Sequence, residues 1–144
     1  RDVIQVTHVH IAFLVRRRFH RSTRIHFKFR IHSQVIAACG SAAKCDLARD
    51  KGAFATIDYS SQPLHDKVKA ITEGRGVDVI MDFVGGDLFK QCLKCIAWEG
   101  RIVIVGFASG SVQQIPANAA LLNSCSIMGI WWGEYMQRAP EVLQ

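Results

Sequence analysis

The stretch that decides the fold is "VDVIMDFVGG" (Val77–Gly86), a run of mostly apolar, β-branched residues that ends in two glycines. Such a run, bounded by turn residues, is typical of a buried β-strand. A helix capped by Asp87 is expected next, because apolar side chains recur on one face at Leu88, Cys92, Leu93 and Ile96. A second strand that ends in glycine follows in "RIVIVGFASG" (Arg101–Gly110). The two strands and the helix between them predict one βαβ unit.

The same alternation extends toward the N-terminus. "QVIAAC" (Gln34–Cys39) predicts another buried strand. Ser41 is placed to cap a helix over 42–51. Gly52 follows as the residue that takes the left-handed conformation after the helix. This segment therefore predicts a second unit in which a strand runs into a helix.

Further elements complete the pattern on both sides of Val77–Gly86. A strand is expected over 53–59, and a helix opens near Ser61 with Pro63 in its first turn. Toward the C-terminus the expected elements are a short helix over 116–123, a strand over 125–132 and the start of a helix over 139–144.

Strands that alternate with helices predict an α/β protein with a doubly wound parallel sheet. Ligands of such sheets lie beyond the carboxyl ends of the strands. Here the expected ends contain glycine, which lets a backbone approach a ligand closely. They are Cys39–Ser41, Phe83–Gly86 and Gly106–Ser109.

Composition divides the chain of 144 residues near Ser33. Residues 1–33 hold eight Lys and Arg against one acid, whereas residues 34–144 hold ten against eleven, and all 11 glycines lie at position 40 or later. We therefore expect one folded domain over 34–144, preceded by an atypical basic segment. No apolar run reaches 18 residues, so no membrane-spanning helix is expected. Five cysteines without a secretory signal favour an intracellular, reducing location.

Four segments in order resemble the medium-chain dehydrogenase/reductase family. They begin at Val35, Ile57, Gly76 and Glu99 and read "VIAACGSAAKCDLARDKGA", "IDYS", "GVDVIMDFVGGDLF" and "EGRIVIVGFASG". The likeness is greatest to the zinc-independent, zeta-crystallin-like quinone oxidoreductase branch. It implies that 34–144 is a Rossmann-like NADPH-binding domain. It also implies that the family architecture is only partly present, because members carry a GroES-like catalytic domain and close with a C-terminal helix and strand, all of which we expect outside this chain.

The resemblance also implies an activity. NADPH would be the cofactor, and a hydride would pass to a quinone or a similar electron-poor, carbonyl-conjugated acceptor. The intact family member is expected to form a homodimer and to be mitochondrial or cytoplasmic. Whether the 144 residues alone are active is left open. The alternative is a non-catalytic or RNA-binding relative of the same fold.

Candidate cofactor residues follow the expected strands. NAD-binding domains place an acid at the end of the second strand, where it binds the ribose 2′-hydroxyl. The strand Gln34–Cys39 instead ends in "AACGS", without an acid, and Lys44 follows, which suits a 2′-phosphate. By the resemblance, Ser41, Lys44 and Tyr59 bind that phosphate. The residues that border the ribose and nicotinamide are, by the same resemblance, Phe83, Val84, Gly85, Gly106, Phe107 and Ala108.

Other chemistry is not expected from the sequence. No constellation of a general acid and base is recognisable, as expected where the cofactor carries the hydride. Cys92 and Cys95 form a CxxC inside an expected helix, without the further ligands that a structural zinc needs. Trp131 and Trp132 are expected to pack in the core or at a subunit interface rather than on the cofactor.

Residues 1–33 do not match the family. The family has a glycine-rich loop and a helix before "VIAACGS", and this segment contains no glycine. Asp2–Thr7 is a candidate first strand, His10–Arg21 could form a short helix without a capping residue, and 24–32 alternates like a strand. Three interpretations remain: a non-native translation product, a basic nucleic-acid-binding arm and an Arg-rich targeting segment.

Overall fold

The computed structural model describes residues 11–16, 33–139 and 141. Their strands form one six-stranded sheet in the order β3-β2-β1-β4-β5-β6. The strands are β1 (Ile11–Arg16), β2 (Ser33–Cys39), β3 (Ala55–Asp58), β4 (Val77–Asp82), β5 (Ile96–Ile104) and β6 (Ser126–Gly129). The helices are α1 (Ala42–Asp50), α2 (Leu64–Ile71), α3 (Gly86–Leu93), α4 (Ala117–Asn123) and α5 (Trp132–Arg138).

Local sequence signals explain why α1 forms where it does. Ser41 has an extended backbone, and its hydroxyl accepts a hydrogen bond from the Lys44 amide at 3.4 Å, so it caps the helix as expected. The helix ends before Gly52, whose φ of 91° is available to glycine at little cost. The prediction of a capped helix after β2 is confirmed.

The central strand β1 runs in the opposite direction to the other five. It pairs antiparallel with β2 and with β4, whereas β2 with β3, β4 with β5, and β5 with β6 are parallel pairs. The expectation of an all-parallel sheet is therefore wrong at its centre, although the doubly wound order is retained. Antiparallel strands can be joined without a crossover helix. The glycine-rich loop that precedes such a helix is therefore not needed for β1 to pair with β2.

The position of β1 also corrects the assignment of elements in the basic segment. Residues 11–16 are a strand, so a helix over His10–Arg21 is wrong for these six residues. Asp2–Thr7 and the alternating stretch 24–32 both lie outside the described residues. The slot that Asp2–Thr7 was expected to fill is occupied by Ile11–Arg16.

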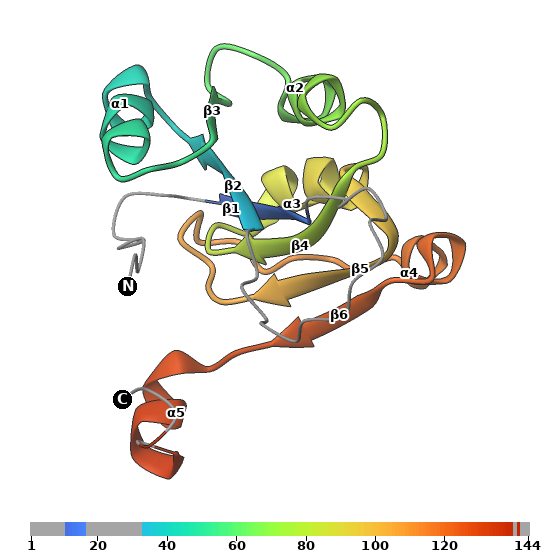
Figure 1. Ribbon diagram of the computed structural model, residues 1–144. Helices are drawn as coiled ribbons and strands as arrows, with labels where there is room; N and C mark the ends of the chain where they lie inside the picture. The colour runs from blue at the N-terminus through green and yellow to red at the C-terminus, as the bar shows by residue number, and fades with distance from the viewer. Residues whose placement is uncertain (1–10, 17–32, 140, 142–144) are drawn as a thin grey trace, which may run out of the picture.

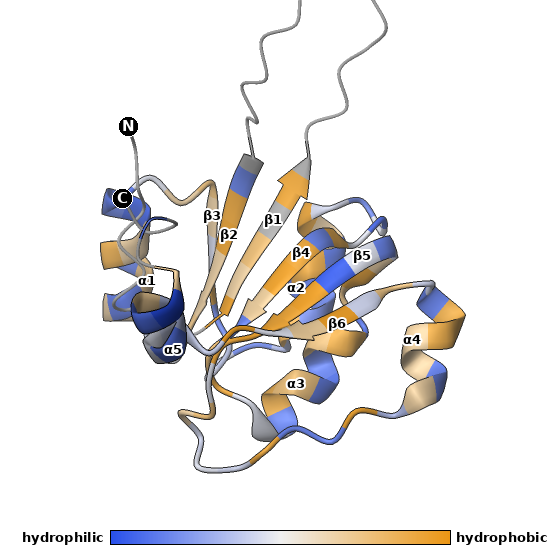
Figure 2. Cartoon of the chain, turned by 90° about the horizontal axis from the view of Figure 1, so that it is seen from below, coloured by the Kyte–Doolittle hydropathy of each residue, from blue (hydrophilic) through white to orange (hydrophobic). Residues whose placement is uncertain are grey.

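Alternate residues of β1 and β2 face two different cores, as the period of a strand requires. One core contains Ile11, Phe13 and Ile36, packed with the buried faces of α2 and α3. The other is smaller and contains Ala12, Ala37, Cys39, Cys45 and Ala48, under α1. Helices thus cover both faces of the sheet, but Figure 2 shows β1, β4 and β5 without a helix in front of them on one face.

Several boundaries differ from the expected ones. Gly85, not Asp87, is the N-cap of α3, and Asp87 lies in the first turn. Ile96 begins β5 instead of completing the apolar face of the helix. Trp131 and Trp132 are both exposed at the start of α5, which lies apart from the sheet in Figure 1. Packing of these two indoles in the core is therefore wrong for the described chain.

Candidate functional site

Five strands reach the carboxyl edge of the sheet and then turn into loops. Cys39 and Asp58 are neighbours there, as the last paired residues of β2 and β3. Asp82 and Ile104 are the last paired residues of β4 and β5. Between these two pairs lies Ile11, the first residue of the reversed β1, which pairs with Ala38 and Asp82. The candidate residues therefore form two groups, one on each side of the start of β1.

The first group contains Ser41, Lys44 and Tyr59. Ser41 and Lys44 lie in the first turn of α1, directly after β2. Tyr59 follows β3, and its amide donates to the Cys39 carbonyl at 3.0 Å, which fixes it beside the end of β2. The structure thus brings a hydroxyl, an ammonium and a phenol to the end of the β2–β3 pair.

Burial controls the protonation of this corner. It raises the pKa of the Tyr59 phenol, and the neighbouring Cys39 and Asp58 raise it further, so the phenol remains a hydrogen-bond donor at neutral pH. The Asp58 carboxylate is turned into its own loop, where Oδ1 accepts from the Ser60 amide at 3.0 Å and the Ser60 hydroxyl at 2.6 Å. The acid nearest to Tyr59 is therefore already engaged.

The second group consists of the loops after β4 and β5. The Ala108 amide donates to the Phe83 carbonyl at 3.0 Å, and the Ser109 amide to the Val84 carbonyl at 2.9 Å. Gly85 has a φ of 75°, and a Cβ placed on it would lie 2.7 Å from the Ser111 carbonyl oxygen. Only glycine fits this turn. The structure therefore brings together the six residues expected here: Phe83, Val84, Gly85, Gly106, Phe107 and Ala108.

Sequence reasoning missed the buried Asp82 that organises these loops. Its side chain is 0% exposed, and Oδ1 accepts from the Val84 and Gly85 amides at 2.9 Å each. Oδ2 accepts from Nε2 of Gln113 at 2.7 Å. The sequence did carry a signal, because a carboxylate at the end of an apolar strand, as in "VIMD", is buried at a high cost unless it has hydrogen-bond donors.

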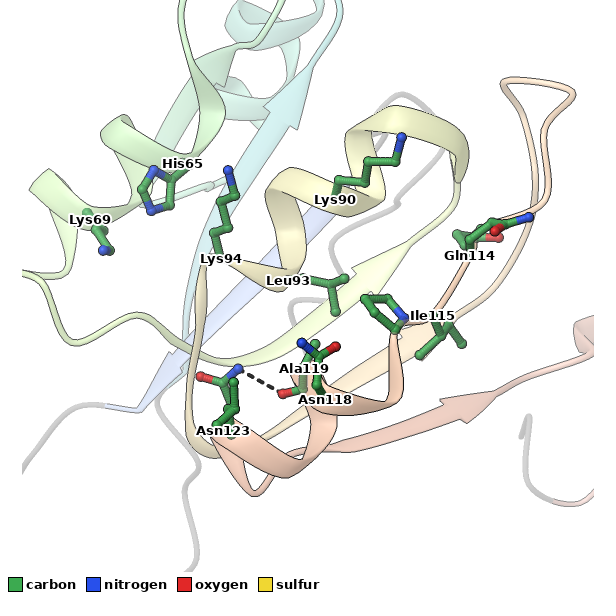
Figure 3. Close-up of a pocket in the computed structure, with 13 residues that line it drawn as sticks. His65, Lys69, Lys90, Leu93, Lys94, Gln114, Ile115, Asn118, Ala119 and Asn123 are labelled. Atoms are coloured by element: carbon green, nitrogen blue, oxygen red, sulfur yellow. Dashed lines mark hydrogen bonds between the residues drawn. The ribbon is translucent and has the colours of Figure 1, made fainter.

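A separate groove of about 960 Å³ lies between α2, α3 and α4 (Figure 3). It is lined by His65, Lys69, Lys90 and Lys94 together with amide and apolar side chains, and none of its lining residues is an acid. The groove flanks the helices and does not contain the residues expected to bind a cofactor. We therefore assign the candidate site to the carboxyl edge of the sheet.

Metal ligands do not gather in the described part of the chain. No group of three or more His, Cys, Asp or Glu side chains there could hold a metal ion. Burial raises the pKa of the Cys92 thiol well above its usual value and that of Cys95 to about 12. The Cys95 thiol donates to the Gln91 carbonyl at 3.2 Å. Burial thus favours the neutral form of both thiols.

Comparison with known proteins agrees with this architecture. Residues 29–144 match the zinc-binding dehydrogenase family. The chain is 52% identical over 101 residues to quinone oxidoreductase-like protein 2 homolog of Nematostella vectensis, covering 70% of this chain and 28% of that protein. It is 46% identical over 106 residues to quinone oxidoreductase-like protein 2 of Rattus norvegicus, covering 74% of this chain and 30% of that protein.

Solved structures show the same fold. The Escherichia coli quinone oxidoreductase complexed with NADPH superposes with a TM-score of 0.70 at 27% identity, over 78% of this chain and 35% of that one. The Pseudomonas syringae quinone oxidoreductase gives a TM-score of 0.68 at 29% identity, over 74% of this chain and 33% of that one. The chain spans less than a third of the two curated relatives. It belongs to the zinc-binding dehydrogenase family, in the quinone oxidoreductase-like branch of the medium-chain dehydrogenases/reductases.

Proposed function

We propose that residues 34–144 are the cofactor-binding portion of an NADPH-dependent oxidoreductase. The whole protein would transfer a hydride from NADPH to a quinone or a similar electron-poor, carbonyl-conjugated acceptor. The acceptor class is taken from relatives named quinone oxidoreductase, of which this chain spans about a quarter to a third. A homodimer of the whole protein is part of the same proposal. No described helix is both long enough and apolar enough to cross a membrane.

One observation carries the choice of NADPH over NADH. Strand β2 ends at Cys39, and a hydroxyl (Ser41) and an ammonium (Lys44) follow it. Where a Rossmann-like domain binds the adenosine ribose, an acid favours the 2′-hydroxyl of NAD, whereas cationic and donor groups favour the 2′-phosphate of NADP. Tyr59, whose phenol is protonated at neutral pH, brings a further hydroxyl to the same corner.

The loops of the second group fit the nicotinamide end. Phe107 is exposed in these loops, and a Cβ on Gly106 would lie 3.4 Å from the Phe83 carbonyl oxygen, whereas the space beside Gly85 is filled by Ser111 and Gln113. When bound, the cofactor supplies the hydride. The protein's part is to orient the ring, and the hydrogen bonds of Asp82 to Val84, Gly85 and Gln113 hold that loop in one shape.

The central part of the edge does not fit a dinucleotide. The pyrophosphate of such cofactors sits on the N-terminus of the helix that follows the central strand. Here β1 begins at the carboxyl edge and ends at Arg16, beside Ser33 at the other edge. The described residues thus offer binding groups for the 2′-phosphate end of NADPH but no helix N-terminus for its pyrophosphate beside β1.

The test compares the binding of NADPH and NADH to a variant in which the charge of Lys44 is reversed. In calorimetric titrations of the 144-residue chain, Lys44→Glu should weaken NADPH binding by about tenfold or more and leave NADH unchanged. Lys67→Glu is the matched control, because Lys67 is exposed on α2 and makes the same change in net charge. Equal losses for NADPH and NADH in Lys44→Glu, or the same loss in Lys67→Glu, would contradict the proposal.

A further inference from the structure

We infer that this chain holds its nucleotide by the 2′-phosphoadenosine end alone, so that adenosine 2′-monophosphate fills the site as well as NADPH does. The inference rests on the proposed function and goes beyond it by naming the ligand class, a 2′-phosphorylated adenine mononucleotide. It follows from the direction of β1, from the hydrogen bonds that Asp82 accepts, and from the parallel pairing of β2 with β3, which places Ser41, Lys44 and Tyr59 together.

The direction of β1 removes the phosphate cradle. Ile11 pairs with Ala38 and with Asp82 at the carboxyl edge, and Arg16 pairs with Ser33 at the amino edge. The connection from β1 to β2 therefore begins and ends at the amino edge. A strand of six residues separates the two edges by about 17 Å at 3.4 Å per residue. The end of β1, after which a Rossmann-like domain places its phosphate-binding loop and helix, therefore lies at the edge opposite the candidate site.

Two amides beside the start of β1 are already used. The Val84 and Gly85 amides already donate to Oδ1 of Asp82 at 2.9 Å each, so they have no hydrogen left for a phosphate. The helix that does begin at this edge, α3, has Asp87 in its first turn. A carboxylate there opposes the binding of a second anion at the positive end of the helix.

The β2–β3 corner is formed in the presence of the reversed β1. Cys39 pairs with Asp58 in a parallel register, and the Tyr59 amide donates to the Cys39 carbonyl at 3.0 Å. Ser41 caps α1 from the same strand end. The groups proposed to bind the 2′-phosphate therefore lie at this corner, whereas the described residues after β1 offer no helix N-terminus for the pyrophosphate at the same edge.

Titration with four nucleotides distinguishes binding by the 2′-phosphoadenosine end alone from binding of the whole dinucleotide. The folded 144-residue chain is titrated by calorimetry with adenosine 2′-monophosphate, adenosine 5′-monophosphate, NADPH and NADH. We expect the dissociation constants of adenosine 2′-monophosphate and NADPH to agree within about threefold. Adenosine 5′-monophosphate and NADH should bind more weakly by about tenfold or more. Lys44→Glu should weaken both 2′-phosphorylated ligands equally, and Lys67→Glu should weaken neither.

A chimera then tests the cause. Replacing residues 1–33 by the first strand, glycine loop and helix of a relative should tighten NADPH by about 100-fold or more, because a second subsite is linked to the first. Adenosine 2′-monophosphate should bind as before. An unchanged NADPH affinity in a chimera that folds, as judged by circular dichroism, overturns the inference.

The outcomes also separate the inference from the proposed function. If the chain as given binds NADPH about 30-fold more tightly than adenosine 2′-monophosphate, the inference is wrong and the proposed function stands. If no 2′-phosphorylated nucleotide binds to the folded chain or to the folded chimera, the proposed function fails and the inference fails with it. These titrations of the chain as given decide the inference even where the chimera does not fold.

Discussion

The Nε2 atom of Gln113 donates to Oδ2 of Asp82 at 2.7 Å, across 31 positions of the chain. This bond joins the segment after β5 to the end of β4. Because the other carboxylate oxygen holds the Val84 and Gly85 amides, one buried side chain fixes both loops of the second group. A buried carboxylate with three donors is costly to disturb, since each donor would be left without an acceptor.

The first prediction concerns the stability that Asp82 confers. Asp82→Ala removes the acceptor of three donors, each of which costs about 1–3 kcal/mol when buried and unsatisfied. We expect the free energy of unfolding to fall by at least about 2 kcal/mol in urea denaturation. Asp82→Asn should cost less, because the amide oxygen still accepts from Val84 and Gly85. The Gln113 amide can turn so that Oε1, which has no partner among the described residues, accepts from the new donor.

The control lies five positions along the chain. Asp87 is 95% exposed and pairs with Lys90, which is also exposed, so Asp87→Asn should leave the denaturation midpoint unchanged. If Asp82→Ala were no more destabilising than Asp87→Asn, the organising role of Asp82 would be wrong.

The elements that the sequence predicted share one property, which is that their signals are local. A cap at Ser41, a glycine after the helix at Gly52 and an apolar run at Val77–Asp82 each act within a few residues, and all three are found in the structure. The direction of β1 is different. A run such as Ile11–Arg16 is equally apolar from either end, so its direction is decided by its neighbours and its connections.

The candidate site divides in the same way. Glycines after apolar strands identified the loops at Phe83–Gly86 and Gly106–Ser109 without knowledge of their contacts. The Asp82–Gln113 hydrogen bond was missed because the sequence around Gln113 does not indicate a partner 31 positions away. Long-range hydrogen bonds of this kind are a property of the packed structure, not of either segment.

The second prediction concerns the thiols. Burial, with a smaller contribution from Cys45, raises the pKa of Cys39 to about 12, and burial raises that of Cys95 to about 12. At pH 8 neither is a thiolate, so iodoacetamide should label the partly exposed Cys125 of the native chain first. Peptide mass spectrometry with and without urea measures this order. Labelling of Cys39 at the rate of Cys125 in the native chain would contradict it.

The same thiols predict a loss of stability in alkali. Their folded-state pKa values of about 12 lie above the ordinary 9.0, so the unfolded chain loses these protons first. The contribution of the neutral thiols is therefore complete below pH 9 and is lost as the pH rises toward 12. Urea midpoints should fall across this range, and Cys39→Ala should reduce the slope of that fall.

The third prediction uses the tryptophans. Trp98, Trp131 and Trp132 are 68%, 75% and 56% exposed. The emission of the dilute chain should therefore have the maximum of a water-exposed indole and be quenched readily by iodide. A blue-shifted, unquenched signal at all protein concentrations would mean that these indoles are packed within one chain. A blue shift that develops only with rising concentration would instead indicate that they lie at an interface between copies.

The fourth prediction is that the purified chain carries far less than one zinc per molecule, although its family is named for zinc binding. A structural zinc needs four ligands, and its cysteine ligands must be thiolates. Cys92 and Cys95 supply two thiols, the Cys95 thiol already donates to the Gln91 carbonyl, and no group of three or more possible ligands gathers among the described residues. Elemental analysis of protein prepared with and without added zinc measures the content, and Cys125→Ser serves as the matched control for loss of a thiol. One zinc per chain that survives dialysis and disappears in Cys92→Ser and Cys95→Ser, but not in Cys125→Ser, would show that these two buried thiols ionise to bind metal.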